Sequence, residues 1–150
     1  MAELPLQAFG DESDGWLNMR LQQRFEKLRA AYPGRRLLIV SNTAGALSYD
    51  PNRRLAEEVE KATGVTVLSH RVKKPGCGDE IMSYFSAHPE TGVTSPNHIA
   101  VVGDRLTTDM MLANTMGSWG VWVRDGVVPL REKSMVSATC LARSGAIFMG

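Results

Sequence analysis

Apolar residues along the chain follow two patterns that alternate with each other. Short uninterrupted apolar runs are typical of strands buried on both faces of a sheet, and they occur at 37–40, 65–68, 99–102 and 121–123. Between and before them, apolar residues recur at helical spacing, as at Leu17, Leu21, Phe25 and Leu28. This spacing predicts helices over 15–31, from Asp50-Pro51 to Gly64, near 81–88, and over 107–116.

Strands that alternate with helices favour one architecture. A parallel sheet needs helical crossovers, and these cover both of its faces. We therefore predict an α/β fold, a three-layer Rossmann-like parallel sheet with helices on both sides. A chain of 150 residues is about one domain's worth.

Composition and charge exclude several classes of function. The formal net charge is +1, so no global field favours nucleic acid or an anionic membrane. Cys77 and Cys140 form neither a disulfide framework nor a zinc ligand set, which indicates a reducing compartment. No apolar run approaches the roughly 18 residues of a membrane span. Residues 1–15 contain four acidic residues and no Arg, so no targeting peptide is visible.

Candidate chemistry lies directly after three of the expected strands, where parallel sheets bind their ligands. The Ser41–Gly45 loop offers hydroxyl, amide and backbone donors that suit a phosphate oxygen, although the same residues also make ordinary turns. Lys74 precedes a proline and could balance phosphate charge, or belong to a solvated basic loop. Asp104 ends a strand and suits Mg²⁺. Asp109 could support that metal, hold the lysine or cap a helix.

Each of these motifs is ambiguous alone, but their order along the chain is informative. Phosphate donors, a cation and a metal-binding carboxylate follow successive strands. This set is typical of phosphoryl transfer.

The same motifs resemble a known family. Ser-Asn-Thr-Ala-Gly at 41–45, Lys-Pro at 74–75 and Gly-Asp-Arg-Leu-Thr-Thr-Asp at 103–109 resemble motifs two, three and four of the haloacid dehalogenase superfamily. The longer segments 37–45, 73–81, 100–109 and 116–123 are similar to the mitochondrial phosphatidylglycerophosphate phosphatases of fungi and plants. The likeness spans roughly residues 20–130.

The resemblance implies an activity and a set of roles. The family removes the terminal phosphate of phosphatidylglycerophosphate, on the route to phosphatidylglycerol and cardiolipin, with Mg²⁺ as cofactor. By its motifs, Ser41 and Asn42 would bind the phosphoryl group and Lys74 would neutralise the phosphate and the nucleophile. Asp104 would ligate the metal, with Asp109 in support. The expected location is the matrix side of the inner mitochondrial membrane, or otherwise the cytoplasm, and peripheral contact with a membrane is left open.

One expected motif is missing from the sequence. The superfamily's reaction needs an Asp-x-Asp pair after a first, central strand, one aspartate as nucleophile and the other as acid and base. No apolar run in residues 1–35 ends in such a pair. Asp11 and Asp14 are three apart and follow Phe9-Gly10, so a helix cap at Asp14 is the simpler interpretation.

Loss of the central strand also affects the fold and the division of the chain. Two strand edges must then close up or be filled, because unpaired buried backbone is costly. We expect either a less stable domain or a substitute strand from residues 1–10. The corresponding organisation is a divergent segment at 1–14, the phosphatase domain at 15–130 and a divergent tail at 131–150, with a short helix near 131–142.

Three functional hypotheses remain at this stage. The first is a phosphatidylglycerophosphatase that is truncated or catalytically impaired as written, and the second is a non-catalytic protein that still binds phosphate and Mg²⁺. The third is a phospho-acceptor signalling module, which would place its lysine after the acceptor aspartate, whereas Lys74 precedes Asp104. No oligomeric state follows from the sequence. Cys77 is expected to be packed or simply exposed rather than reactive, and Trp119 and Trp122 are expected to pack against neighbours of the sheet.

Overall fold

The computed structural model describes residues 23–123 and 145–149. Two compact units divide the chain, Met1–Pro33 and Gly34–Gly150. In the first unit, residues 23–31 are helical, which agrees with the later part of the helix expected at 15–31. The expected helix near 131–142, Cys140, Asp11 and Asp14 lie outside the described residues.

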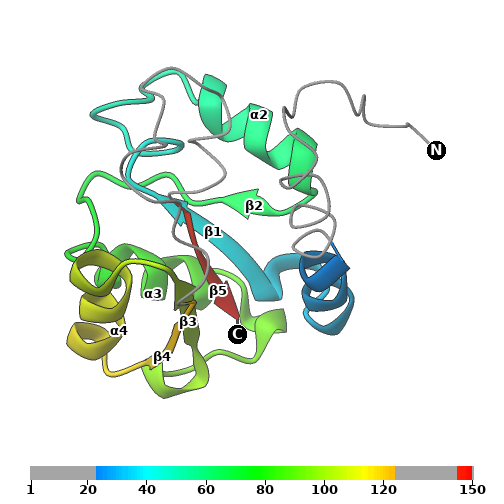
Figure 1. Cartoon of the computed structure of the whole chain (residues 1–150), viewed down its shortest axis with the longest axis vertical. Helices are drawn as coiled ribbons and strands as arrows, with labels where there is room; N and C mark the ends of the chain where they lie inside the picture. Colours follow the sequence, from blue (N-terminus) through cyan, green and yellow to red (C-terminus); the bar gives the residue numbers. More distant parts are fainter. Residues whose placement is uncertain (1–22, 124–144, 150) are drawn as a thin grey trace, which may run out of the picture. The chain divides into compact units, whose positions relative to one another are not determined.

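The second unit is built on a five-stranded sheet (Figure 1). A 3₁₀ turn, η1 (Gly34–Arg36), leads into the first strand. The strands are β1 (Leu37–Ser41), β2 (Thr66–Val67), β3 (Ala100–Gly103), β4 (Trp119–Trp122) and β5 (Gly145–Met149), in the order β2-β1-β5-β3-β4. β2 is parallel to β1, and β4 is parallel to β3. These four strands match the four apolar runs.

The middle of the sheet differs from the expectation. The slot between β1 and β3 is filled by β5, near the end of the chain, and not by residues 1–10 (Figure 1). β5 runs antiparallel to both neighbours, so the sheet is mixed and not wholly parallel. Its ladder pairs Ser41 with Gly145 and Val102 with Ile147. The physical reason is the one anticipated, since buried backbone groups on β1 and β3 need partners, but the sequence does not say which apolar segment supplies them.

Helices lie on both sides of this sheet, which confirms the predicted α/β layers. Figure 1 shows α2 on one side and α3 and α4 on the other. The elements are α2 (Arg54–Thr63), α3 (Gly78–Ser86), η2 (Pro89–Thr91), η3 (Pro96–His98), η4 (Leu106–Met110) and α4 (Met111–Met116). The helix expected at 107–116 therefore begins as a π-helical segment, η4. None of the described helices is long and apolar enough to cross a membrane.

The hydrophobic core joins α3 and α4 to the sheet. Ile81 and Phe85 of α3 and Leu112 of α4 are fully buried in one cluster with Phe148 of β5. Burying an aromatic or aliphatic side chain of this size contributes roughly 1.5–3 kcal/mol. Because Phe148 belongs to this cluster, β5 contributes side-chain packing as well as backbone pairing.

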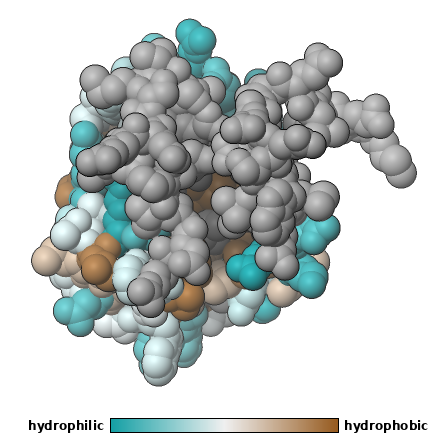
Figure 2. Space-filling view, in the orientation of Figure 1, coloured by the Kyte–Doolittle hydropathy of each residue, from teal (hydrophilic) through white to brown (hydrophobic). Residues whose placement is uncertain are grey.

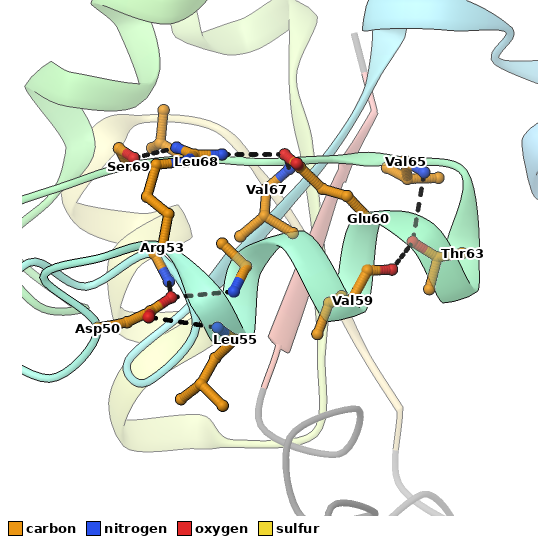
Figure 3. Close-up of polar contacts among 12 residues, drawn as sticks. Asp50, Arg53, Leu55, Val59, Glu60, Thr63, Val65, Val67, Leu68 and Ser69 are labelled. Atoms are coloured by element: carbon orange, nitrogen blue, oxygen red, sulfur yellow. Dashed lines mark hydrogen bonds and ion pairs between the residues drawn. The ribbon is translucent and has the colours of Figure 1, made fainter.

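Asp50 and Glu60 fix the ends of the α2 crossover (Figure 3). α2 begins at Arg54, later than the Asp50-Pro51 start that the sequence favours, after Arg53 in a left-handed conformation (φ 57°). The Asp50 carboxylate nevertheless accepts hydrogen bonds from the N–H groups of Leu55 (3.2 Å) and Ala56 (2.9 Å). Glu60 accepts the N–H of Val67 (2.8 Å) and an Arg53 guanidinium N–H (3.1 Å), and so occupies a donor on the edge strand β2.

Trp119 and Trp122 do not pack as expected. Both are exposed on β4, an edge strand, with 70% and 46% of their surface accessible. Their indole N–H groups donate to the carbonyls of Asn97 (3.1 Å) and Asp104 (3.2 Å). The expectation failed because a strand at the edge of a sheet has one fewer neighbour to cover it.

Candidate active site

A buried ion pair lies at the carboxyl ends of the strands. Lys74, in the loop after β2, places its Nζ 2.7 Å from Oδ1 of Asp109 in η4. The two side chains are 1% and 2% exposed. Burial lowers the pKa of Lys74 from its ordinary value, and the attraction of Asp109 opposes that shift. The lysine expected to neutralise phosphate is therefore held inside the protein by a carboxylate.

The backbone around Asp109 is shaped to hold that carboxylate. Its Oδ2 accepts the N–H of Arg105 (3.2 Å). A Cβ added to Gly103 would lie 2.3 Å from the same oxygen, so only glycine leaves room for Asp109 at the end of β3. The Gly-Asp pair of the sequence motif thus has a packing reason in Gly103, separate from the chemistry of Asp104.

Asn42 connects the first loop to the lysine. Its Oδ1 accepts the backbone N–H of Lys74 (2.8 Å), and its Nδ2 donates to the backbone carbonyl of the same residue (3.4 Å). Both ends of the amide are therefore used by the lysine's backbone. In this geometry Asn42 positions Lys74, while direct phosphate binding by Asn42 stays a prediction.

Ser41 ends β1 inside the same region. It is 1% exposed, and its Oγ lies 2.9 Å from the hydroxyl of Thr43. The backbone N–H of Thr43 also donates to Ser41 Oγ (3.3 Å). Either hydroxyl can be the donor of the bond between the two side chains, so the Ser41 hydroxyl can donate to a phosphate oxygen when it does not donate to Thr43.

The structure also shows supporting carboxylates that the sequence did not single out for this role. Glu80 of α3 accepts the backbone N–H groups of Arg71 (2.8 Å) and Val72 (3.2 Å), which fixes the loop that leads to Lys74. Asp50 accepts the N–H of Gly45 (3.1 Å) in the Ser41–Gly45 loop, besides those of α2. Asp50 was expected to begin a helix, but its bond to the Ser41–Gly45 loop was not, and no local pattern predicts the contacts of Glu80 eight and nine residues earlier.

Burial and hydrogen bonding act in opposite directions on Asp50. Burial alone would raise the pKa of its carboxyl group, but the N–H donors of Ala56, Gly45 and Leu55 outweigh it, so the pKa is lower than its ordinary value. The ionised carboxylate is therefore the form that fits the fold.

Cys77 is a packed residue. It is fully buried in the hydrophobic core cluster at the start of α3. Burial raises the pKa of its thiol to about 11, which keeps it protonated at neutral pH. The packed alternative is confirmed.

The metal-binding potential of the region is limited to the aspartates. Asp104 is half-buried directly after β3, and its backbone carbonyl accepts the Trp122 indole N–H. Within residues 23–123 and 145–149, no group of three or more His, Cys, Asp or Glu side chains converges on one point. Mg²⁺ commonly takes only one or two carboxylates and completes its shell with waters and substrate phosphates, so the donor set fits an ion bound together with a phosphate.

The central strand brings no carboxylate to this region. β5 has the sequence Gly-Ala-Ile-Phe-Met, and Gly145 is the residue paired with Ser41. Because β5 is antiparallel, its amino end, not its carboxyl end, lies beside the Ser41 loop. The structure thus assembles the residues of motifs two to four without showing a nucleophile among the described residues.

Comparison with known proteins decides the family. A family model described as mitochondrial PGP phosphatase matches residues 8–128. This chain belongs to that family. The likeness first seen in three short motifs extends over most of the sequence, and the haloacid dehalogenase-like layers of the fold agree with it.

The curated relatives that match this chain are longer proteins. The mitochondrial phosphatidylglycerophosphatase of Saccharomyces cerevisiae is 52% identical over 105 residues, which cover 70% of this chain and 55% of that protein. A probable mitochondrial phosphatidylglycerophosphatase of Schizosaccharomyces pombe is 35% identical over 105 residues, 70% of this chain and 49% of that protein. The chain thus spans about half the length of these relatives. No solved structure matches it.

Proposed function

We propose that this chain binds and dephosphorylates phosphatidylglycerophosphate, and that its turnover is slow as written. The observation that carries the proposal is the buried Lys74–Asp109 pair, tied through Asn42 to the Ser41 loop. The curated relatives named phosphatidylglycerophosphatase support the choice of substrate. Their mitochondrial names support a mitochondrial location for this chain.

In the proposed binding step, the phosphoryl group approaches the Lys74 ammonium, and Ser41 changes its hydrogen-bond partner. In a site shielded from water, an ammonium group attracts a phosphate oxygen more strongly than it would in solvent. Asp109 keeps Lys74 charged, because a buried lysine without a carboxylate would tend to lose its proton. Ser41 would donate its hydroxyl to a phosphoryl oxygen in place of Thr43, while Asn42 holds the Lys74 backbone.

The proposed metal site centres on Asp104. Asp104 would hold Mg²⁺ directly, and Asp109, whose oxygens already serve Lys74 and the Arg105 N–H, would support it. The ion would neutralise charge on the phosphoryl group.

The attack on phosphorus needs a group that the described site does not supply. In the superfamily reaction an aspartate forms an aspartyl-phosphate and releases the alcohol. The Ser41 loop has Gly145 as its strand neighbour, and no apolar run in the sequence ends in Asp-x-Asp. Since removing a nucleophile and its acid usually costs several orders of magnitude in rate, slow turnover follows.

The test combines turnover with binding. Phosphate release from phosphatidylglycerophosphate by the 150-residue chain would be measured with and without Mg²⁺, beside Asp104→Ala. Inorganic phosphate binding would be measured by calorimetry, beside Lys74→Ala. We expect Mg²⁺-dependent release that is slow and absent in Asp104→Ala, and phosphate binding that is lost in Lys74→Ala. Release that is equal in wild type and Asp104→Ala would overturn the proposal, as would phosphate binding that does not need Lys74.

A further inference from the structure

Exposed apolar side chains gather where the strands of the phosphate site end. Among the described residues, five such side chains lie in the segments that follow or close the parallel-paired strands β1, β2, β3 and β4. We call these five residues the apolar rim: Leu47, Tyr49, Val72, Leu106 and Trp122.

Hydrogen bonds tie the segments of the apolar rim to one another and to the site. The Leu47 N–H donates to the carbonyl of His70 (3.0 Å), which joins the loops after β1 and β2. The Trp122 indole donates to the carbonyl of Asp104, which joins the end of β4 to the loop after β3. The Lys74–Asp109 pair then links the loops after β2 and β3. The segments of the rim therefore lie at the same end of the sheet as the candidate phosphate site.

Positive charge accompanies the apolar rim. Arg71 and Lys73 flank Val72 and are exposed, and Arg105 precedes Leu106. On the face drawn in Figure 2, apolar residues of the described part lie between hydrophilic ones. Single apolar side chains separated by cations suit a surface that is itself both apolar and anionic.

We propose that the apolar rim and its three cations dock this chain on an anionic lipid bilayer, with the phosphate site facing the headgroups. The inference rests on the proposed function, because a phosphate group carried by a lipid reaches the site only if the site faces the membrane. Charge complementarity selects the occupant, since Arg71, Lys73 and Arg105 would meet anionic headgroups while the rim enters the boundary with the acyl chains.

The size of the effect can be bounded. Moving a large apolar side chain out of water is worth about one power of ten in an equilibrium constant when it is fully buried. Val72 and Leu106 are 52% and 57% exposed, so a large part of each side chain is available for insertion. A cation close to an anionic surface adds roughly a fivefold factor that falls as salt rises.

The experiment is co-sedimentation of the full chain with vesicles. One set of vesicles contains phosphatidylcholine and roughly a third phosphatidylglycerol, and the other contains phosphatidylcholine alone. We expect binding to the first set only. Val72→Ser with Leu106→Ser should lower the partition coefficient roughly tenfold, and Lys73→Gln roughly fivefold at low salt.

Trp119 provides the matched control. It is the most exposed large apolar side chain described, but it opens β4 at the opposite end of the strand from Trp122. Trp119→Ser should leave vesicle binding unchanged. An equal loss in Trp119→Ser and the rim variants, or equal binding to both sets of vesicles, would overturn the proposal.

Two further measurements separate this proposal from its alternatives. Inorganic phosphate binding should be the same in wild type and in Val72→Ser/Leu106→Ser. A wild type that binds no phosphate would contradict the proposed function, whereas a wild type that binds phosphate but no vesicles would contradict docking alone. Light scattering without lipid tests whether the rim instead joins copies of the chain. A concentration-dependent oligomer that the rim variants dissociate, with no vesicle binding, would contradict the membrane assignment.

Discussion

Asp50 and Asp109 are both buried carboxylates beside the candidate phosphate site, yet their partners differ in kind. Asp50 accepts three backbone N–H groups, from Gly45, Leu55 and Ala56. Asp109 is bound to the Lys74 ammonium and to one N–H group, that of Arg105. A carboxylate held by backbone can only stabilise the fold, because its donors have no other task. A carboxylate held by a cationic side chain lies beside a group that can also attract an anionic ligand.

The strongest way to break this comparison is Asp109→Ala. It leaves the Lys74 ammonium buried without the carboxylate, and removal of one partner of a buried pair costs about 3–5 kcal/mol of unfolding free energy. Phosphate binding should also be lost, because Lys74 is then free to deprotonate. Urea unfolding and calorimetry measure the two effects.

The matched control replaces both members of the pair. Lys74→Met with Asp109→Leu leaves no buried charge, so it should unfold within about 1–2 kcal/mol of wild type and still fail to bind phosphate. If this double variant were as unstable as Asp109→Ala, the loss could not be assigned to an uncompensated lysine.

Asp50→Ala should give the next largest effect. It leaves three backbone N–H groups without their acceptor, which we expect to cost about 2–3 kcal/mol in urea unfolding. Phosphate affinity of the folded fraction should change little. A large loss of affinity with unchanged stability would contradict the structural role given to Asp50.

Gly103→Ala tests how tightly Asp109 is held. The new Cβ would lie 2.3 Å from Asp109 Oδ2, so the carboxylate must move, and overpacking of this kind costs about 1–3 kcal/mol. In an Asp109→Gly background, which also removes the Asp109 Cβ that would lie 2.6 Å from the new atom, the same substitution should cost much less. Equal costs in the two backgrounds would mean that Gly103 is needed for another reason.

The parts of the fold that could be predicted from the sequence are those that depend on a local pattern of residues. Apolar runs such as Ile99–Val102 indicate a strand by themselves, so the four strands other than β5 could be predicted from such runs. The family could be predicted from its sequence motifs. The identity of the central strand could not, because several apolar segments satisfy the same backbone demand, and only packing of Phe148 with the core shows why β5 fits. The exposure of Trp119 and Trp122 was likewise hidden, since it depends on which strand ends up at the edge.

The same distinction applies to the candidate site. Ser41 and Asp104 could be proposed because they stand at or directly after the end of a strand. Lys74 and Asp109 could be proposed because they lie in the segments that follow β2 and β3. Glu80 could not, because its carboxylate binds backbone N–H groups eight or nine residues earlier, where neither partner has a distinctive side chain. Candidate ligand-binding residues can be predicted from their side-chain type and their place after a strand, whereas a residue such as Glu80 that only fixes a loop has no such pattern.

The smallest expected effect is the pH dependence of the stability that Asp50 contributes. The pKa of Asp50 is lowered in the folded state, so its contribution is present above the unfolded-state value of about 3.9 and is lost as pH falls through the folded-state value. Asp50→Asn removes this titration while keeping an oxygen acceptor. Urea unfolding at pH 7 and below pH 4 should therefore show a smaller acid-induced loss in Asp50→Asn than in wild type. If the two lost stability in parallel, the backbone donors would not be stabilising the ionised form of Asp50.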